Sequence, residues 1–190
     1  GGAFNPAHEG HAHISRLALK HLKLDELWWL VSPQNPLKPV KGMAPLEERL
    51  ATARAVAPDR RVKVTDIERQ LGTRYTVDTL KALKRRFPRV AFVWVAGADI
   101  LAQLPRWQRW SEVMSLVPIA VFDRPSYSLR ALASKAAQRY RRRRIAPHAA
   151  SRLADMQPPA WSFVPSRLNA ASATALRRQR RATPKRSRPS

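Results

Sequence analysis

The sequence has no cysteine among its 190 residues, so it holds no disulfide framework, no cysteine-based zinc site and no thiol nucleophile. It is poor in acidic residues, with 13 Asp and Glu against 36 Lys and Arg, and its formal charge is +23. No apolar run approaches the roughly 18 residues of a membrane span. Yet 44% of the residues are hydrophobic, which excludes a wholly disordered basic chain. These features favour a cytoplasmic, globular, strongly basic protein of about one domain.

The excess positive charge is concentrated late in the chain. Residues 130–190 hold 16 basic side chains and a single acidic one, Asp155. The two densest clusters are Arg139 with residues 141–144, and residues 177–188. Such clusters attract phosphates and other polyanions, although a solvated helix face and a frayed end would explain them as well. Because residues 178–190 are almost free of apolar side chains, we expect a disordered basic tail after a domain of residues 1–177.

Helical and strand-like apolar patterns alternate along the chain. Helices are expected over 9–23, over 45–57, over 76–86, over 128–143 and from about 172. Pro45 is expected at the first position of its helix, and Thr76 as the cap of the next. Strands are expected over 26–31, 61–65, 90–96, 118–122 and 162–164. The alternation favours an α/β fold, a Rossmann-like doubly wound parallel sheet with its ligand crevice at the carboxyl ends of the strands.

A sheet of this kind needs an apolar strand that runs into the turn at Gly1 and Gly2. No residue precedes Gly1 in this sequence. Without that strand, its neighbours would expose apolar faces and unpaired backbone groups. We therefore expect the first strand to be missing from the sequence as it stands.

The segment from Gly2 to His11 carries the clearest chemical signal. His8 and His11 are three residues apart, with Gly10 between them, and they straddle the start of the first expected helix. At that spacing the two side chains lie on one face. A helix N-terminus suits a phosphate, and two imidazoles beside it can donate hydrogen bonds to oxygens whose charge grows during a reaction. Two histidines alone would also fit a metal-binding pair or ordinary, partly buried side chains.

In its full context, G-G-A-F-N-P-A-H-E-G-H resembles the signature of bacterial nicotinate-nucleotide adenylyltransferases, nucleotidyltransferases with an H-x-G-H motif. Arg74 and Ala173 stand where that family has serine, and residues 139–150 match no element of it. The other similar segments follow in the same order as in the family, up to about residue 178: S-P-Q-N-P-L-K at 32–38, D-I-E at 66–68, Y-T-V-D-T-L at 75–80, G-A-D at 97–99, L-P-R-W at 104–107, D-R-P at 123–125 and S-A-T-A-L-R at 172–177.

The resemblance implies transfer of the adenylyl group of ATP to nicotinate mononucleotide, with Mg²⁺ bound mainly through the ATP phosphates. His8 and His11 are the implied catalytic residues and hold the phosphates of ATP. The other implied ATP-binding residues are Gly2, Phe4, Asp99, Ser172, Thr174 and Arg177. The implied nicotinate mononucleotide-binding residues are Asn5, Lys38, Tyr75, Thr76 and Trp107, with the indole stacked on the nicotinate ring. No residue is assigned as a metal ligand, and Asp66 and Glu68 are interpreted as structural.

The sequence alone leaves alternatives to this function. A relative acting on nicotinamide mononucleotide stays open, because backbone groups can recognise the carboxylate that distinguishes the two substrates. The Tyr75-Thr76 and L-P-R-W segments disfavour phosphopantetheine as the acceptor. A nucleic-acid-binding protein is disfavoured because the tail has no aromatic residue and no known binding motif is present. An inactive relative has no positive support, and the oligomeric state stays open, a homo-oligomer included.

Overall fold

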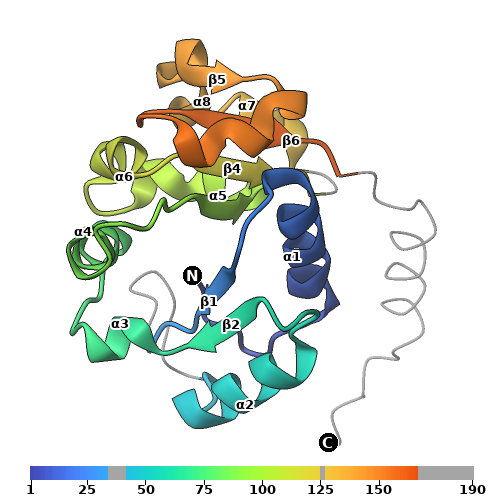
Figure 1. Ribbon diagram of the computed structural model, residues 1–190, viewed down its shortest axis with the longest axis vertical. Coiled ribbons are helices and arrows are strands. Elements are labelled where there is room, and N and C mark those ends of the chain that lie inside the picture. The colour runs from blue at the N-terminus through green and yellow to red at the C-terminus, as the bar shows by residue number, and fades with distance from the viewer. Residues whose placement is uncertain (34–41, 125–126, 167–190) are drawn as a thin grey trace, which may run out of the picture.

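A computed structural model of the chain describes residues 1–33, 42–124 and 127–166. Parallel strands alternate with helices, as the sequence predicts (Figure 1). The strands are β1 (Leu27–Leu30), β2 (Val62–Thr65), β3 (Trp94–Gly97), β4 (Ile119–Phe122), β5 (Arg144–Ile145) and β6 (Trp161–Val164). The α-helices are α1 (Glu9–Leu22), α2 (Leu46–Val56), α3 (Ile67–Gln70), α4 (Thr76–Arg86), α5 (Ala98–Gln103), α6 (Trp110–Leu116), α7 (Ser128–Leu132) and α8 (Lys135–Arg139). Shorter 3₁₀ helices are η1 (Leu104–Arg106), η2 (Arg141–Arg143) and η3 (Pro147–Asp155).

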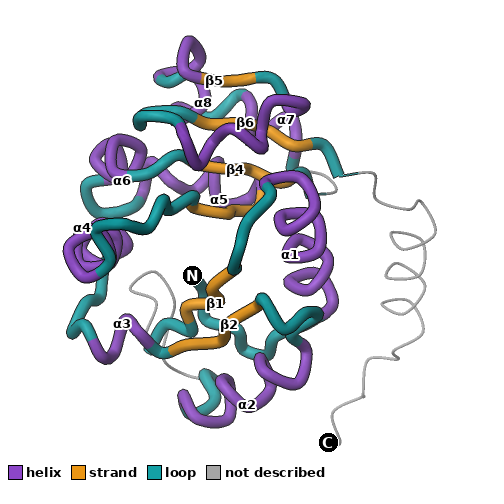
Figure 2. The backbone as a smooth tube through the Cα atoms, in the orientation of Figure 1, coloured by secondary structure: helices purple, strands orange, loops and turns teal. Residues whose placement is uncertain are grey.

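The described strands form two parallel sheets. β1 pairs with β2, from Leu27 opposite Val62 to Leu30 opposite Thr65. The larger sheet has the order β3-β4-β6-β5. Figure 2 shows α1 on one side of these strands, and α4 and α6 on the other. The architecture is therefore mixed α/β with parallel sheets, in agreement with the fold class predicted from the sequence.

β4 lies between β3 and β6 in the larger sheet and is buried along its whole length. Its side chains point alternately to the two faces of the sheet, as in any strand. Ala120 and Phe122 join a core formed with α1, β1, β2 and η3. Ile119 and Val121 join a second core formed with α4 to α8. The unbroken apolar run of β4 thus reflects burial on both faces of a parallel sheet.

The N-terminal residues lie beside β1 on its edge away from β2. Gly2 forms an isolated parallel bridge with Val31, donates to the Leu30 carbonyl at 3.0 Å and accepts from the Ser32 N–H at 2.9 Å. A cavity of about 830 Å³ is lined by Gly2, by residues of β1 and by residues of β3. It separates the facing edges of the two sheets. The strand expected before Gly1 stays a prediction.

Several boundaries differ from the sequence-based expectations. The strand expected over 90–96 is β3, from Trp94 to Gly97, because pairing starts only where β4 lies alongside. The single helix expected over 128–143 is broken, since Ser134 caps a new helix by accepting the Ala137 N–H at 3.2 Å. Pro45 is the N-cap of α2 and not its first helical residue. β5 and η3 were not expected, and the helix expected from about residue 172 lies outside the described residues.

Candidate functional site

The first turn of α1 holds His8 and His11 in place. His8 is the N-cap residue, and its Nδ1 accepts a hydrogen bond from the Gly10 N–H at 3.1 Å. In return, His11 Nδ1 accepts from the His8 N–H at 3.2 Å. This reciprocal pair is a capping box built from imidazoles. Because each Nδ1 is an acceptor, each neutral ring carries its proton on Nε2 and keeps that N–H for a ligand.

Gly10 leaves room for the His8 ring. A Cβ at position 10 would lie 2.9 Å from His8 Cε1 and 3.0 Å from His8 Nδ1, which is closer than side-chain carbons normally approach. The ring centres of His8 and His11 are 3.9 Å apart. The glycine of the H-x-G-H motif therefore has a local physical reason, because His8 folds back over the helix N-terminus only if position 10 has no side chain.

The core supports His11 from behind. Its ring centre lies 4.8 Å from that of Phe4 and 6.0 Å from that of Trp29. Ser15 Oγ donates to the His11 carbonyl at 2.8 Å and accepts from Trp29 Nε1 at 2.8 Å. The imidazole is therefore held in one orientation by packing and by the helix, before any ligand binds.

Both histidines are neutral near pH 7. Burial lowers the pKa of His11 to about 4, and repulsion from His8 in its protonated form and from Arg124 adds to this effect. Partial loss of hydration, and then Arg124, lower the pKa of His8. The site therefore offers neutral hydrogen-bond donors beside a permanent guanidinium charge.

We predict that His11 makes the folded protein less stable as the pH falls from about 6.5 to about 4. Its pKa in the folded state lies below its ordinary value, so the unfolded chain binds the proton more readily and protonation favours unfolding in that window. The effect is absent above that window. Between pH of about 7.5 and about 4.5, the free energy of unfolding should fall by roughly 1–2 kcal/mol more in the natural protein than in His11→Asn, as measured by denaturant titration. Equal losses would contradict the lowered pKa.

A second group of polar residues follows the carboxyl ends of β3 and β4. Asp99 lies in the first turn of α5, and Arg124 follows β4. Arg124 Nη1 donates to Asp99 Oδ2 at 3.0 Å. Asp99 Oδ1 is buried and has no hydrogen-bond partner within the described part of the chain. A free acceptor at this edge of the sheet suits a ligand hydroxyl, while the ATP contact expected of Asp99 stays a prediction.

Arg124 connects this group to the histidines. A Cβ on Gly10 would lie 3.8 Å from Arg124 Nη2, and a Cβ on Gly97 would lie 2.6 Å from Asp99 Oδ1 and 3.1 Å from Arg124 Cδ. Gly97 thus makes space for the ion pair. Arg124 was not among the predicted site residues, although it lies two residues after a buried strand and within the D-R-P segment at 123–125.

Arg49 is a buried cation behind the Gly-Gly loop, and it was also not predicted. It is 2% exposed and donates to four backbone carbonyls. Nε bonds Ala44 at 2.9 Å, Nη1 bonds Ala3 and Ser32 at 2.8 Å each, and Nη2 bonds Pro33 at 3.1 Å. Arg49 therefore ties the loop before α1 to the segment after β1 and to the segment before α2. Its place on the apolar face of α2 is the sequence signal.

The loop residues Phe4 and Asn5 make contacts within the protein. Phe4 is buried, and its ring stacks on Trp29 with centres 5.1 Å apart. Asn5 Nδ2 donates to the Gly42 carbonyl at 3.1 Å, and Asn5 Oδ1 accepts from the Ala44 N–H at 3.1 Å. Both side chains thus shape the loop, while their predicted ligand contacts stay predictions.

Tyr75, Thr76 and Trp107 line the cavity of about 830 Å³ that also reaches Gly2. Tyr75, and not Thr76 as expected, is the N-cap of α4, and no side chain caps this helix. The N–H groups of Thr76 and Val77 at its start have no acceptor within the helix, whereas that of Asp78 bonds the Tyr75 carbonyl at 3.0 Å. The ring of Trp107 lies 5.5 Å from that of Trp94, centre to centre. Residues predicted to bind one substrate are therefore brought together from α4 and from the loop between η1 and α6.

The remaining predicted residues divide into two groups. Lys38, Ser172, Thr174 and Arg177 lie outside the described residues. Asp66 pairs with Arg69 and accepts from Gln70 Nε2, and Glu68 is buried, which agrees with their interpretation as structural.

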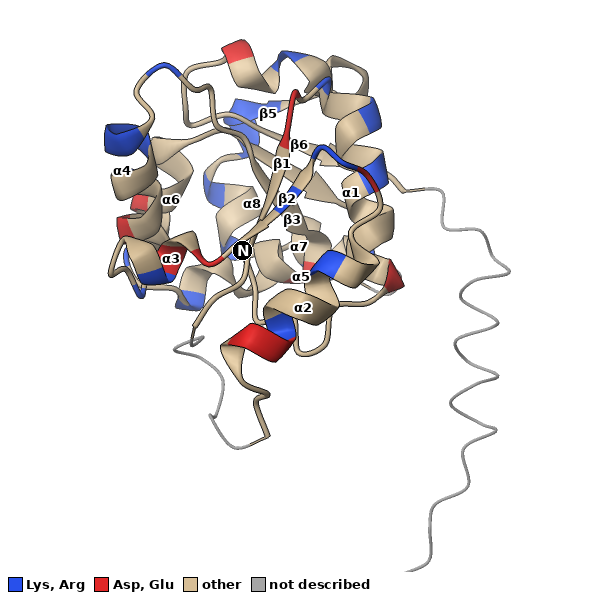
Figure 3. Cartoon of the chain, turned by 60° about the horizontal axis from the view of Figure 1, so that its bottom comes forward, with Lys and Arg blue, Asp and Glu red and all other residues tan. Residues whose placement is uncertain are grey.

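The arginine cluster at 139–144 covers aromatic rings at the end of the larger sheet. Arg139 lies over Trp110, and Arg144 lies over Trp161, with guanidinium carbons 5.8 Å and 5.4 Å from the ring centres. Figure 3 shows the Lys and Arg colour on the ribbon around β5. These contacts account for two of the arginines by packing, apart from the candidate site.

Comparisons with known proteins show the family of the chain. The cytidylyltransferase-like family model matches residues 1–179. "Probable nicotinate-nucleotide adenylyltransferase" of Methylorubrum extorquens is 52% identical over 177 residues, covering 93% of this chain and 96% of the relative. The protein of the same name from Gluconacetobacter diazotrophicus is 53% identical, covering 93% of this chain and 82% of the relative.

Solved structures resemble the fold. Plasmodium falciparum nicotinic acid mononucleotide adenylyltransferase complexed with APC has a TM-score of 0.66 at 12% identity, covering 90% of this chain and 74% of that one. The same enzyme complexed with NaAD has a TM-score of 0.64 at 13% identity, with the same coverage. Within the described residues, no helix has the length and apolar character needed to cross a membrane. The chain therefore belongs to the cytidylyltransferase-like family, and the relatives it resembles at about half identity are named nicotinate-nucleotide adenylyltransferases.

Proposed function

We propose that the chain transfers the adenylyl group of ATP to nicotinate mononucleotide, a reaction of NAD biosynthesis, and releases pyrophosphate. The observation that carries this proposal is the pair of Nε2–H donors that His8 and His11 present at the N-terminus of α1. Relatives at about half identity bear the name of this activity. We assign the activity to residues 1–177, ahead of the basic tail of residues 178–190, and propose the cytoplasm as its location.

The chemistry is a single in-line displacement. A phosphate oxygen of nicotinate mononucleotide attacks the α-phosphorus of ATP, a new P–O bond forms, and the bond to pyrophosphate breaks. No covalent enzyme intermediate is required, so the protein acts by positioning the reactants and stabilising charge. His11 Nε2–H donates to the α-phosphate, and His8 Nε2–H donates to a neighbouring phosphate oxygen. Because both donors are fixed before the substrate binds, little reorganisation opposes the reaction.

Each substrate has its own part of the site. Asp99 Oδ1, which lacks a hydrogen-bond partner within the described residues, accepts a hydrogen bond from a ribose hydroxyl. The first turn of α4 at Tyr75 and Thr76 binds the nicotinate carboxylate, partly through backbone N–H groups. Trp107 stacks on the pyridine ring. The contacts proposed for Lys38, Ser172, Thr174 and Arg177 are with phosphates, because hydroxyl, ammonium and guanidinium groups donate well to phosphate oxygens.

A divalent cation, Mg²⁺ in our proposal, accompanies ATP. His8, His11 and Arg124 lie around the α1 N-terminus and suit phosphate oxygens more than a hard cation, while the carboxylates of Glu9 and Asp99 pair with Arg16 and Arg124. In the described residues, no cluster of three or more His, Asp or Glu side chains is placed to hold a metal. The donors present therefore fit a cation held by ATP oxygens and water. When bound, it neutralises phosphate charge.

The experiment that tests this function is an assay of pyrophosphate release with ATP, Mg²⁺ and one acceptor at a time. Nicotinate mononucleotide should give the fastest turnover and yield nicotinate adenine dinucleotide. Faster turnover with nicotinamide mononucleotide would change the substrate to the amide. No turnover with either mononucleotide would reject the proposed function.

We predict that Gly10→Ala lowers kcat/KM by roughly 10-fold, because the new methyl group displaces the His8 ring from its bond to the helix N-terminus. The measurement is steady-state pyrophosphate release. The double variant His8→Ala, Gly10→Ala shows whether the loss in Gly10→Ala comes from displacement of the His8 ring or from another effect of the methyl group. If Gly10 serves only to make room for His8, the double variant should be no slower than His8→Ala. A further loss in the double variant would contradict this explanation.

A further inference from the structure

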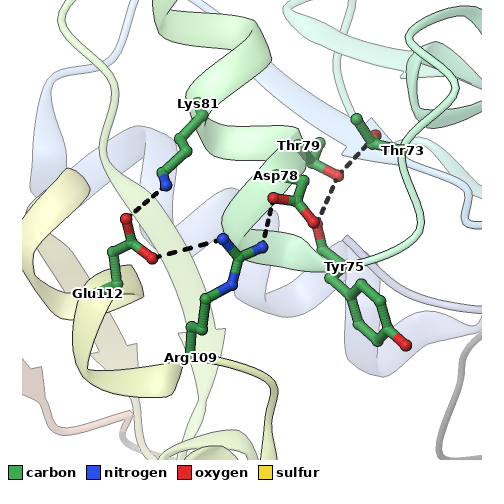
Figure 4. A network of polar contacts seen from close by, with 7 residues as sticks. All are labelled: Thr73, Tyr75, Asp78, Thr79, Lys81, Arg109 and Glu112. Atoms are coloured by element: carbon green, nitrogen blue, oxygen red, sulfur yellow. Dashed lines mark hydrogen bonds and ion pairs between the residues drawn. The ribbon is translucent and has the colours of Figure 1, made fainter.

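A chain of ion pairs links α4 to the N-terminus of α6. Figure 4 shows Asp78 and Lys81 on α4 facing Arg109 and Glu112. Arg109 Nη2 lies 2.5 Å from Asp78 Oδ1, and Arg109 Nη1 lies 3.8 Å from Glu112 Oε2. Lys81 Nζ lies 2.5 Å from Glu112 Oε1. Charges of opposite sign therefore alternate across the boundary between the two elements.

Both linked segments are adjacent to residues that line the cavity. Asp78 is in the first turn of α4, three residues after Tyr75, and its N–H bonds the Tyr75 carbonyl at 3.0 Å. Arg109 is two residues after Trp107. Tyr75 and Trp107 both line the cavity. The ion pair between Arg109 and Asp78 thus also helps to set the distance between the N-terminus of α4 and the Trp107 ring.

The backbone at Arg109 adopts a conformation that is uncommon for a residue with a side chain. Arg109 is the N-cap of α6 and adopts φ 48° and ψ 42°, a left-handed conformation that disfavours side chains with a Cβ. Glycine would adopt it with less strain. The guanidinium contacts the carboxylates of Asp78 and Glu112. Since these side chains are 38% and 37% exposed, the pairs add little to global stability, and their effect is local.

Trp107 is held on its other side by packing. Its ring lies against Trp94, at a tilt of 49°. Its Nε1 is buried and finds no hydrogen-bond partner within the described residues. The indole is thus oriented by Trp94 and by the path of the backbone, and the backbone from Trp107 onward is anchored at Arg109.

We propose that the Asp78–Arg109 pair, supported by Lys81 and Glu112, is a positioning clamp that sets the spacing between Trp107 and the start of α4, and thereby the affinity for the pyridine mononucleotide. The inference deepens the proposed function and rests on it. These side chains act through Trp107 and the α4 N-terminus without touching the reacting atoms. Loss of the clamp therefore weakens binding of one substrate while the histidine site is unchanged.

The test uses Asp78→Asn, Arg109→Asn and their combination in the full chain, with KM and kcat measured for each substrate. Asparagine tolerates the left-handed backbone, so Arg109→Asn removes the charge without new strain. We expect KM for nicotinate mononucleotide to rise roughly 5- to 10-fold, while KM for ATP and kcat stay within about 2-fold. The double variant should resemble the single ones, and Arg109→Lys should recover part of the loss.

The matched control is Arg61→Asn, which breaks an exposed pair of 3.0 Å with Asp59 away from the cavity. It should leave all kinetic constants unchanged. Suppose that the natural protein turns over nicotinate mononucleotide. The clamp proposal is then wrong if KM for nicotinate mononucleotide is unchanged in the clamp variants, or if KM for both substrates rises equally. If the natural protein itself shows no turnover with the mononucleotide, the proposed function fails, and the clamp proposal fails with it.

Discussion

Replacing His11 by alanine should lower kcat by at least about 10²-fold, the size expected when a donor to the developing charge is removed. The neutral ring is oriented by the His8 N–H at 3.2 Å and by the nearby rings of Phe4 and Trp29. Its Nε2–H is therefore aimed before ATP arrives. Alanine removes this donor and also the acceptor for the His8 N–H. The measurement is pyrophosphate release at saturating concentrations of both substrates.

The matched control for His11→Ala is His21→Ala, because His21 is exposed at the far end of the same helix. Its turnover should equal that of the natural protein. Thermal unfolding of both variants will show whether the alanine at position 11 merely unfolds the chain. A folded His11→Ala protein with a near-normal kcat would contradict the role assigned to His11.

Replacing Arg49 by methionine should lower the free energy of unfolding by about 2–4 kcal/mol. The carbonyls of Ala3, Ser32, Pro33 and Ala44 would all lose a donor. Methionine fills a similar volume, so the loss reports mainly the unsatisfied carbonyls. Because these carbonyls hold together the loop before α1 and the segment after β1, KM for ATP should rise as well. Denaturant titration and steady-state kinetics measure the two effects.

Arg54→Met is the control on the same helix, because Arg54 is exposed. It should change the free energy of unfolding by less than about 0.5 kcal/mol. Arg49→Lys should fall between the two, since one ammonium group reaches fewer carbonyls than a guanidinium. If Arg49→Met costs no more than Arg54→Met, the buried guanidinium is not the anchor of these loops.

The features predicted well from sequence are those that depend on near neighbours. α1 starts at Glu9 because the His8 side chain accepts an N–H two residues on, and the His11 ring accepts one three residues back. The apolar run of β4 predicts a strand because both of its faces are covered. The boundary of β3 was missed because pairing depends on where β4 begins, which the residues of 90–96 do not encode.

The sequence by itself determined the fold class, through the alternation of helical and strand-like patterns. It also determined the histidine site, because helix geometry places residues two to four apart on one turn. Tertiary structure alone decided the rest. Arg49 reaches a carbonyl 46 residues away, Arg124 meets Asp99 from 25 residues away, and Arg109 meets Asp78 from 31. Such contacts form only after the strands have been packed side by side, and the free energy that brings them together comes mostly from burial of the core between them.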